Sequence, residues 1–462
     1  MAVKRNAGLA AALTLVAALS VSTAGPTSAA RGSTRTDPAP ADVVLRWYDI
    51  TDQTVSAAAF PEAITQSRTW AVSWLAAVRA VGERNDTDYT TAAFAQALHD
   101  TLAALVPSQQ SQLDADLAAT LAAIPDDPAR QAGIESGQNQ AAAVLAERRA
   151  DGTDTASLDI PYTPPPPGPG IWQPTPPTFG PAVRAGQGNA RPFLLARNNQ
   201  FDPGPPPSLS SRTYLSALAE VRAYGSATST ARTPAQTDVA LFWFPALNFA
   251  YVQILRAVLA GSSRPLRWDA TLVAAFHAIT TDAQIAIYNA KFQYVFWRPV
   301  TAIRDGSIQP DPGWTPLSVT PRYPEYPSGH GGYAGAAQQV LTAFLGPDAP
   351  APIALTSPND PGVIRTYAKW AVITREVIDA RVWEGVHFRF SDITGVREGK
   401  QVASYDLRHL SRLLSLAGQA SVRVIATFPI VLIYIRREVA HGDRPALVPA
   451  DQRRLAQRPE PR

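Results

Sequence analysis

A stretch dense in proline and glycine interrupts this chain and separates two regions of different character. Residues 162–181 read YTPPPPGPGIWQPTPPTFGP. Because proline lacks an amide donor and fixes φ, this stretch excludes regular helix. It contains or adjoins apolar anchors that a solvated linker would not need: Ile171, Trp172, Phe179 and Phe193. We therefore expect residues 156–232 to form an extended crossover that lies across a helical body, rather than a free linker.

Helical periodicity predicts helices on both sides of this crossover. In the N-terminal helical region, residues 31–155, the side chains of Trp70, Trp74 and Val78 follow helical spacing. Strand-like alternation is scarce, and the helices predicted after the crossover cover 234–260, 268–291, 334–345, 363–383 and 396–418. The sequence therefore predicts a mainly α protein of two packed helical bundles. We expect the active site in the C-terminal bundle, residues 233–420, with a C-terminal extension over residues 421–462.

Three short blocks in the C-terminal half supply side chains suited to chemistry on an anion. They read KFQYVFWRP at 291–299, PSGH at 327–330 and RVWEGVH at 381–387. Together they contain three cations, two short hydrogen-bond donors and two histidines: Lys291, Arg298, Arg381, Ser328, Gly329, His330 and His387. Arginine offers a planar fork of donors and lysine a point charge. One histidine can bond the central atom of a tetrahedral oxyanion, and the other can move protons.

The surroundings of these residues strengthen that interpretation. Ser328 and Gly329 precede a predicted helix, whose N-terminus attracts anions. Aromatic residues flank Lys291 and Arg298, which indicates that both cations are buried and need an anionic partner. Their spacing puts them two turns apart on one face if the helix continues. For each histidine, the alternative is a neutral residue of the core. Asp392 can support a ring nitrogen, and Tyr288, Tyr323 and Glu325 are expected to line the pocket.

The pattern K-x6-R-P, then P-S-G-H, then R-x5-H resembles the shared signature of vanadium-dependent haloperoxidases and type 2 phosphatidic acid phosphatases. The resemblance is specific from about residue 235 to about residue 410. Two positions depart from the family pattern: Ala380 stands where the family often has Ser, and Ser391 where it often has Asp, with Asp392 one step later. Bacterial haloperoxidase-like proteins also have a crossover with Pro and Trp, so the resemblance extends to the crossover.

The haloperoxidase side of the resemblance implies vanadate as the cofactor and hydrogen peroxide and a halide as substrates. His387 would bond the metal, and His330 would act as the acid–base group. The oxygens would be held by Lys291, Arg298, Ser328, Gly329 and Arg381, and Lys291 would also polarise the peroxide. The product would be hypohalous acid. The FWRPVTAIR and RFSD segments and the length of the chain favour this side.

Two alternatives use the same residues. As an exported acid phosphatase without a cofactor, the protein would act on a phosphate monoester. His387 would then attack phosphorus, and His330 would protonate the leaving alcohol. The other alternative is an oxyanion-binding protein without turnover. The presence of both histidines disfavours it, because binding alone needs no acid–base group.

The N-terminus predicts export. Lys4 and Arg5 precede an apolar run, and small residues end at Ala30, which is typical of a cleaved signal peptide over residues 1–30. We therefore expect a secreted protein. Removal of Lys4 and Arg5 lowers the formal net charge from +3 to +1, and no basic cluster indicates a nucleic-acid partner.

Two further observations narrow the class of protein. The apolar residues 424–435 contain Pro429 and are too few for a membrane span, so we expect no stable membrane insertion of the mature chain. The absence of cysteine excludes disulfides and thiolate metal sites. The sequence specifies neither an oligomeric state nor a preferred halide.

Overall fold

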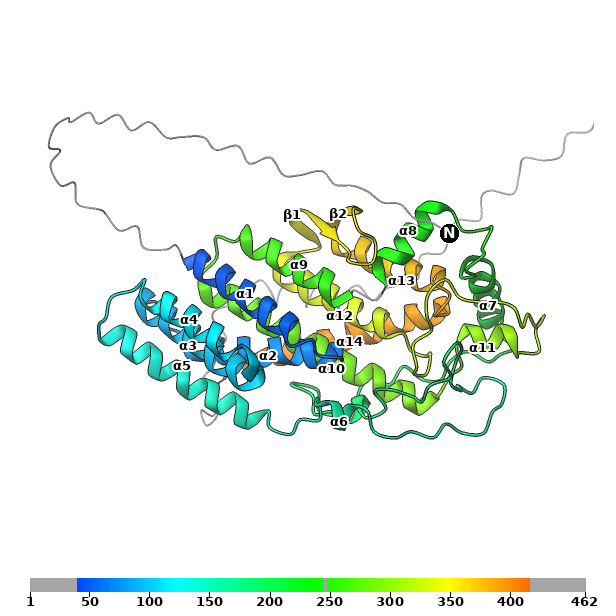
Figure 1. Ribbon diagram of the computed structural model, residues 1–462, viewed down its shortest axis with the longest axis horizontal. Helices are drawn as coiled ribbons and strands as arrows, with labels where there is room; N and C mark the ends of the chain where they lie inside the picture. The colour runs from blue at the N-terminus through cyan, green and yellow to red at the C-terminus, as the bar shows by residue number, and fades with distance from the viewer. Residues whose placement is uncertain (1–39, 245–246, 416–462) are drawn as a thin grey trace, which may run out of the picture. The chain divides into compact units, whose positions relative to one another are not determined.

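The computed structural model describes residues 40–244 and 247–415, which are mainly α-helical (Figure 1). The prediction of a mainly α protein is confirmed. The expected signal peptide, most of the C-terminal extension and the apolar residues 424–435 lie outside the described residues. The N-terminal helices are α1 (Pro40–Ala57), α2 (Ala63–Val81), α3 (Thr87–Leu105), α4 (Gln110–Leu121), α5 (Pro128–Glu147) and the short α6 (Thr155–Leu158). Aspartate side chains cap several of them; for example, Asp86 accepts from the amide of Tyr89 at the start of α3.

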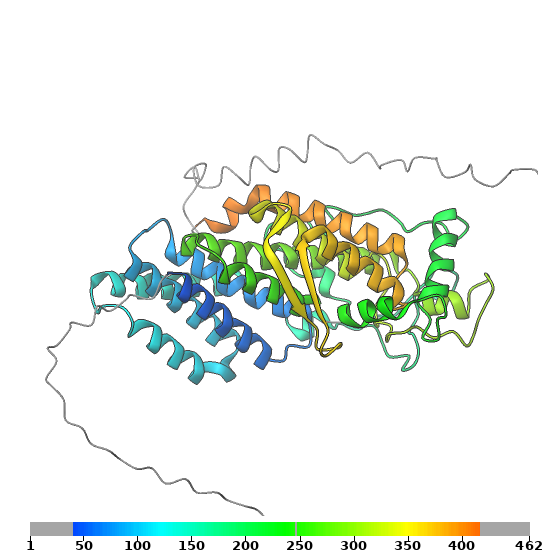
Figure 2. The same cartoon turned by 90° about the horizontal axis from the view of Figure 1, so that it is seen from above.

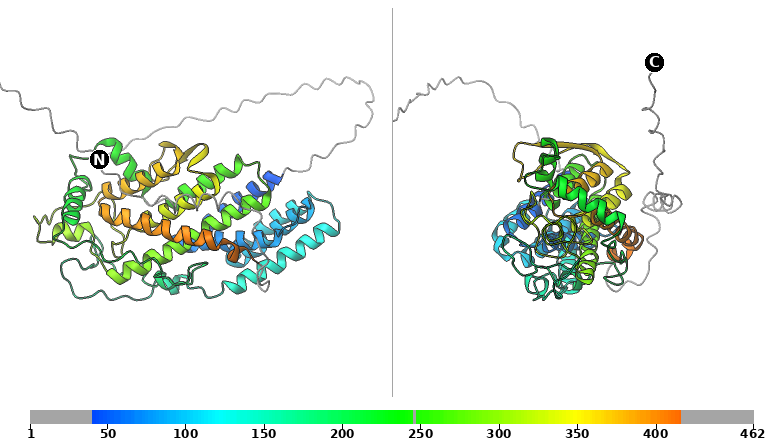
Figure 3. Two further views of the ribbon diagram at one scale, coloured as in Figure 1. Left: turned by 180° about the vertical axis from the view of Figure 1, so that it is seen from behind. Right: turned by 90° about the vertical axis from the view of Figure 1, so that its right-hand side faces the viewer.

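The C-terminal helices follow the crossover. They are α7 (Arg212–Tyr224), α8 (Pro234–Trp243), α9 (Leu247–Ala260), α10 (Leu266–Tyr294), α11 (Pro299–Arg304), α12 (Gly329–Leu345), α13 (Trp370–Trp383) and α14 (Arg389–Leu414). Helix α10 packs against α2 on one side and against α12 and α14 on the other, so it joins the two groups of helices (Figure 3). One continuous apolar core runs through both groups.

Helix α10 is buried because it lies between the two groups. Among the single helices of the described residues, it alone is long and apolar enough to span a membrane, and its apolar window is wholly buried inside the protein. The buried polar side chains of this helix include His277 and Asp282. His277 stacks on Trp70 at a ring distance of 4.9 Å, and burial lowers its pKa to about 3, so it is a neutral core residue.

The crossover is an extended segment held against α10. Trp172 is fully buried, and its amide donates to the carbonyl of Val295 at 2.8 Å. Further along, the carboxylate of Asp282 accepts from three consecutive amides, those of Phe193, Leu194 and Leu195, at 2.6 to 3.1 Å. The crossover forms no helix or sheet here, so its amides lack the usual backbone partners. These bonds supply partners for them. The prediction of an extended crossover is confirmed for this part.

Two expectations for the crossover are wrong. Phe179 is 62% exposed and anchors nothing. The extended conformation also stops before residue 232, because Arg212–Tyr224 forms α7. Ser211 caps that helix by accepting from the amide of Tyr214, and the helix buries Leu218 and Val221.

A β-hairpin replaces the start of one predicted helix. Strands β1 (Asp348–Thr356) and β2 (Ile364–Lys369) pair antiparallel, with Ile353 opposite Tyr367 (Figure 2). The helix predicted at 363–383 therefore begins only at Trp370. Tyr367 explains the difference, because its ring is buried and its hydroxyl donates to Glu376 of α13 at 2.6 Å. Tertiary packing of one face thus overrides the helical pattern.

Candidate functional site

The ends of four helices carry the residues of the three blocks. Lys291 lies in the last turn of α10, and Arg298 is the N-cap of α11. Ser328 caps α12, which begins with Gly329 and His330. Arg381 lies in the last turn of α13, and His387 lies in the connection from α13 to α14. Helix ends are suited to this task because their side chains and free backbone groups converge on one place.

Lys291 and Arg298 do not share a helix face, contrary to the expectation from their spacing. Helix α10 ends at Tyr294, and Val295 adopts the left-handed conformation with φ of 49°. The amide of Val295 closes the helix on the carbonyl of Lys291 at 2.9 Å. The chain then turns so that Arg298 starts a new helix before Pro299. The sharp turn, rather than helical spacing, places the two cations near one another.

The two cations are buried and held by backbone carbonyls. Nζ of Lys291 donates to the carbonyls of Pro324 and Glu325, at 3.1 and 2.8 Å. The guanidinium of Arg298 donates to the carbonyls of Tyr323 and Val386, at 3.0 and 2.9 Å. Burial lowers the pKa of both groups, and for Lys291 the nearby charge of Arg298 lowers it further. Nη2 of Arg298 is buried and has no protein partner.

His387 is held in one tautomer. Its Nδ1 lies 2.7 Å from Oε1 of Glu325, and its Nε2 lies 3.2 Å from Nη1 of Arg298. Because a guanidinium only donates, Nε2 must accept, and the ring proton is therefore on Nδ1 and donated to Glu325. The lone pair of Nε2 faces the cations. Burial and the neighbouring Arg298 and Lys291 lower the pKa of His387, so the ring is neutral.

Glu325, rather than Asp392, supports the ring nitrogen of His387. The sequence predicted that Asp392 supports a ring nitrogen and that Glu325 lines the pocket, and both predictions are wrong. The carboxyl of Glu325 is completely buried and also accepts from the amide of Phe388 at 3.0 Å. Burial raises its pKa to about 7, although Arg298 and Lys291 lower it. Asp392 is instead buried beside the hydroxyl of Ser328, and burial raises its pKa well above the usual range.

Arg381 has a buried carboxylate partner that sequence inspection missed. Its Nη1 donates to Oε2 of Glu384, and both side chains are at most 1% exposed. Burial raises the pKa of Glu384 to about 7, against the lowering effect of Arg381. Nε of Arg381 remains buried without a protein partner. The signal was present in the sequence, since an acid three residues after a base on a helix can form an ion pair.

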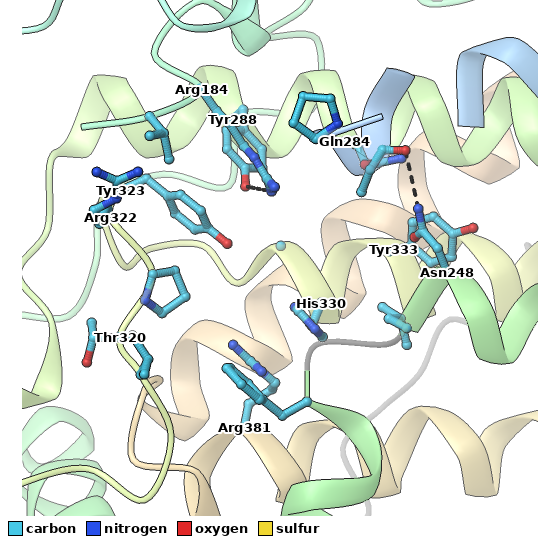
Figure 4. Close-up of a pocket in the computed structure, with 18 of the residues that line it drawn as sticks. Arg184, Asn248, Gln284, Tyr288, Thr320, Arg322, Tyr323, His330, Tyr333 and Arg381 are labelled. Carbon is cyan, nitrogen blue, oxygen red and sulfur yellow. Dashed lines mark hydrogen bonds between the residues drawn. The ribbon is translucent and has the colours of Figure 1, made fainter. Parts of the chain in front are cut away.

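A cavity of about 800 Å³ opens beside these residues (Figure 4). Gly329, His330 and Arg381 line it, whereas Lys291, Arg298, Ser328 and His387 lie buried behind its wall. Nε2 of His330 is buried without a protein partner. Burial and then the charge of Arg381 lower the pKa of His330, so this ring is also neutral.

Tyr288 and Tyr323 line the cavity, as the sequence suggested, and an arginine from the crossover joins them. Arg184 donates from Nη1 to the hydroxyl of Tyr288 at 3.2 Å and forms an ion pair with Glu62 at the start of α2. Figure 4 shows Arg184, Tyr288 and Tyr323 on one side of the cavity and His330 with Arg381 on the other. No periodic pattern in the crossover could have identified Arg184.

The donors fit a tetrahedral oxyanion. Within the described parts of the chain, no group of three or more His, Cys, Asp or Glu side chains could hold a metal cation. Two buried N–H donors without a protein partner instead point to an anionic ligand: Nη2 of Arg298 and Nε of Arg381. Buried polar atoms of this kind normally have partners, so an oxyanion that accepts from them would remove an energetic penalty of about 1–3 kcal/mol per group.

Comparison with known proteins agrees with this geometry. Residues 271–415 match the family model of the VCPO second helical-bundle domain. They run from within α10 to beyond the end of α14 and include all three blocks. Residues 271–415 are thus similar to a domain of vanadium haloperoxidases. This similarity confirms the resemblance inferred from the blocks.

The individual relatives are distant from this chain in sequence. A vanadium chloroperoxidase from Curvularia inaequalis is 27% identical over 226 residues, which cover 35% of this chain and 37% of that protein. The chain thus spans little more than a third of the length of this curated relative. A bacterial vanadium-dependent iodoperoxidase has the same fold, with a TM-score of 0.68 and 20% identity over 82% of this chain and 98% of that chain.

A second solved structure has the same fold. It is a holo-type bacterial vanadium-dependent chloroperoxidase, with a TM-score of 0.58 and 18% identity over 83% of this chain and 95% of that chain. Both solved structures cover most of this chain, so the likeness in fold extends beyond the matched residues 271–415 to the N-terminal helices.

Proposed function

We propose that this protein is a vanadate-dependent haloperoxidase that oxidises halide with hydrogen peroxide to hypohalous acid. One observation carries the proposal: Nη2 of Arg298 and Nε of Arg381 are buried without protein partners, in a site with a histidine whose ring is oriented by Glu325. A bound oxyanion would accept from both groups. The matched family model and the vanadium-dependent relatives support vanadate as that oxyanion.

The residues divide the task of holding vanadate. His387 would bond the metal through Nε2, because Nδ1 is engaged by Glu325. Lys291, Arg298 and Arg381 would offset the negative charge, and the start of α12 at Ser328 and Gly329 would add backbone donors. When bound, vanadate supplies a Lewis acid that activates hydrogen peroxide toward halide without changing its redox state.

His330 is the proposed acid–base group. Its neutral ring can accept a proton from hydrogen peroxide, and it lies on the cavity wall where peroxide arrives. A bound oxyanion offsets the cations that depress its pKa, so the ring can hold that proton and return it to a departing oxygen. Lys291 has three N–H donors and uses two on carbonyls, which leaves one to polarise the peroxide.

A paired assay on the purified protein tests the proposal. One sample receives orthovanadate, hydrogen peroxide, bromide or iodide, and a small halogenation indicator. A second, vanadate-free sample receives an aryl phosphate. We expect vanadate-dependent halogenation. Phosphate release without halogenation would replace the proposal by the phosphatase alternative, in which His387 attacks phosphorus. Inactivity of both samples, together with tight oxyanion binding, would favour the binding-protein alternative.

We also propose that the protein is exported and that residues 1–30 are removed. The charged start, the apolar run and the small residues before Ala30 support this. N-terminal sequencing of protein recovered from the culture medium tests it. A mature chain beginning at Arg31 is expected, and retention of Lys4 and Arg5 in the recovered protein would contradict it.

A further inference from the structure

The cavity is far larger than the proposed reaction requires. A tetrahedral oxyanion has four oxygens, which occupy on the order of 100 Å³ at the ~30 Å³ that a water molecule occupies in the liquid. Hydrogen peroxide and one halide add little to this. The cavity measures about 800 Å³, which is the size of sites that hold organic ligands. Most of its space is therefore left for another molecule.

The cavity is largely apolar at its mouth, although the exposed Arg322 also lines it, and polar at its inner end. Phe249 of α9 and Val319, in the segment before α12, line it and are 45% and 65% exposed. Pro176 and Pro177 of the crossover line the same opening. Three separate parts of the chain thus present apolar surface around one entrance. Apolar side chains gathered at the rim of a polar cavity mark a binding site for an organic molecule.

The polar groups beyond this rim suit a neutral hydroxyl better than a carboxylate. Two cations line this part of the cavity: Arg322, which is exposed to solvent, and the less exposed Arg184, whose charge is already offset by Glu62. Nη1 of Arg184 donates to the hydroxyl of Tyr288, and the ring of Tyr323 lies 5.7 Å from its guanidinium. The uncharged polar groups include the amide of Gln284. Such groups exchange hydrogen bonds with a hydroxyl without needing to compensate a second charge.

We propose that this outer cavity binds a phenol with an apolar body, which serves as the acceptor of the oxidised halogen. The inference rests on the proposed haloperoxidase function. The phenolic hydroxyl would lie among Arg184, Tyr288 and Tyr323, and the apolar body against Phe249 and Val319. Hypohalous acid formed beside His330 would then meet an activated ring before it escapes. A carbon–halogen bond forms, the oxygen–halogen and ring carbon–hydrogen bonds break, and the ring proton leaves with hydroxide as water.

Calorimetric titration of the full protein with matched probes tests this binding without turnover. The probes are 4-tert-butylphenol, 4-tert-butylbenzoate and phenol itself. We expect saturable binding of 4-tert-butylphenol, with weaker binding of the benzoate, which carries a charge, and of phenol, which lacks the apolar body. Val319→Ser should weaken binding about threefold to tenfold, because it removes apolar area from the mouth. Ile364→Ser is the matched control, since Ile364 is also 65% exposed but lies on β2 outside the cavity.

The outcomes separate this inference from the function on which it rests. Vanadate-dependent halogenation of a small indicator without saturable binding of 4-tert-butylphenol overturns the acceptor site and leaves the haloperoxidase proposal intact. Tighter binding of the benzoate, or equal binding by the two serine variants, also overturns it. Saturable binding of 4-tert-butylphenol by a protein without halogenating activity overturns the haloperoxidase proposal. It also overturns the proposal that the bound phenol accepts the halogen.

Discussion

The inner oxyanion site and the outer cavity differ in burial and in origin. Lys291, Arg298 and His387 of the inner site are at most 1% exposed, and each is held by carbonyls or a carboxylate. The outer cavity is formed by the crossover, α9 and the segment before α12, with Phe249 and Val319 open to solvent. The difference indicates that the inner site provides the chemistry, whatever the acceptor, and that the outer cavity selects the acceptor. Substitutions in the two regions should therefore have different kinds of effect.

The largest effect is expected at the inner site for His387→Ala. It removes the only side chain positioned to bond vanadium in the proposed mechanism, so vanadate binding and halogenation should both fall by at least about a thousandfold. Equilibrium dialysis with vanadate and the halogenation rate measure this. His409→Ala, which removes a histidine of α14 bonded only to the carbonyl of Tyr405 in the described structure, is the control and should keep full activity. Normal activity of His387→Ala would refute the site.

His330→Ala should lower the turnover rate without lowering the affinity for the oxyanion. Loss of the proposed acid–base group lowers the turnover rate by about 10²–10⁴-fold. Oxyanion affinity should change little, because the three cations and His387 remain. Steady-state kinetics at saturating vanadate, together with the dissociation constant of vanadate, check both expectations. A parallel loss of affinity and rate would show that His330 holds the oxyanion instead.

Glu325→Gln tests whether the carboxylate that holds His387 matters for the metal. The amide keeps the shape but cannot offer a charged acceptor to Nδ1–H, so the ring loses its fixed tautomer and some basicity. Vanadate affinity should fall about 10–100-fold. A thermal unfolding curve establishes that the variant is folded. Unchanged affinity in a folded variant would mean that Glu325 only fills space beside Phe388.

A smaller effect is expected for Glu384→Gln, and it is seen in the pH dependence. Because burial raises the pKa of Glu384 to about 7, its carboxyl is neutral below that pH and charged above it. When Glu384 ionises, its negative charge offsets the positive charge of Arg381. The affinity of the site for an oxyanion should therefore fall as pH rises from about 6 to about 8. Because one proton is linked to binding, the affinity can change by at most about tenfold per pH unit.

Sulfate is the probe for this experiment, because its charge does not change over this pH range. The affinity of Glu384→Gln for sulfate should exceed that of the unmodified protein at about pH 8 and match it at about pH 6. The sulfate affinity of the variant should therefore depend less on pH than that of the unmodified protein. Identical pH curves would exclude Glu384 as a modulator of Arg381.

The smallest effect on chemistry is expected in the outer cavity. Val319→Ser should leave vanadate affinity and halogenation of a small indicator within about twofold, because no buried contact changes. Only discrimination between 4-tert-butylphenol and phenol should shrink. The measurement is a competition between the two phenols for halogenation. A loss of indicator halogenation equal to that of an inner-site variant would abolish the distinction between the two regions.

Local sequence patterns predicted the elements that carry the inner site. Ser328 and Gly329 were expected to precede a helix at 334–345, and in the structure α12 begins earlier, at Gly329, with Ser328 as its N-cap. Tyr288 and Tyr323 were expected on the pocket wall and line it. These predictions succeed because capping, helical periodicity and turn chemistry act over a few residues. Where a long-range contact competes with the local pattern, as for Tyr367 on β2, the prediction is wrong.

By itself, the sequence determined that the chain is mainly α and that three blocks resemble the signature of vanadium-dependent haloperoxidases. Only the tertiary structure decided that Glu325 rather than Asp392 holds His387, that Glu384 offsets Arg381, and that Arg184 of the crossover reaches the cavity. The physical reason is that a side chain's partner in a buried site depends on where helices and loops pack. Glu325 and Asp392 are similar acids close to the same blocks, and their different partners follow from the position of α12 against α14.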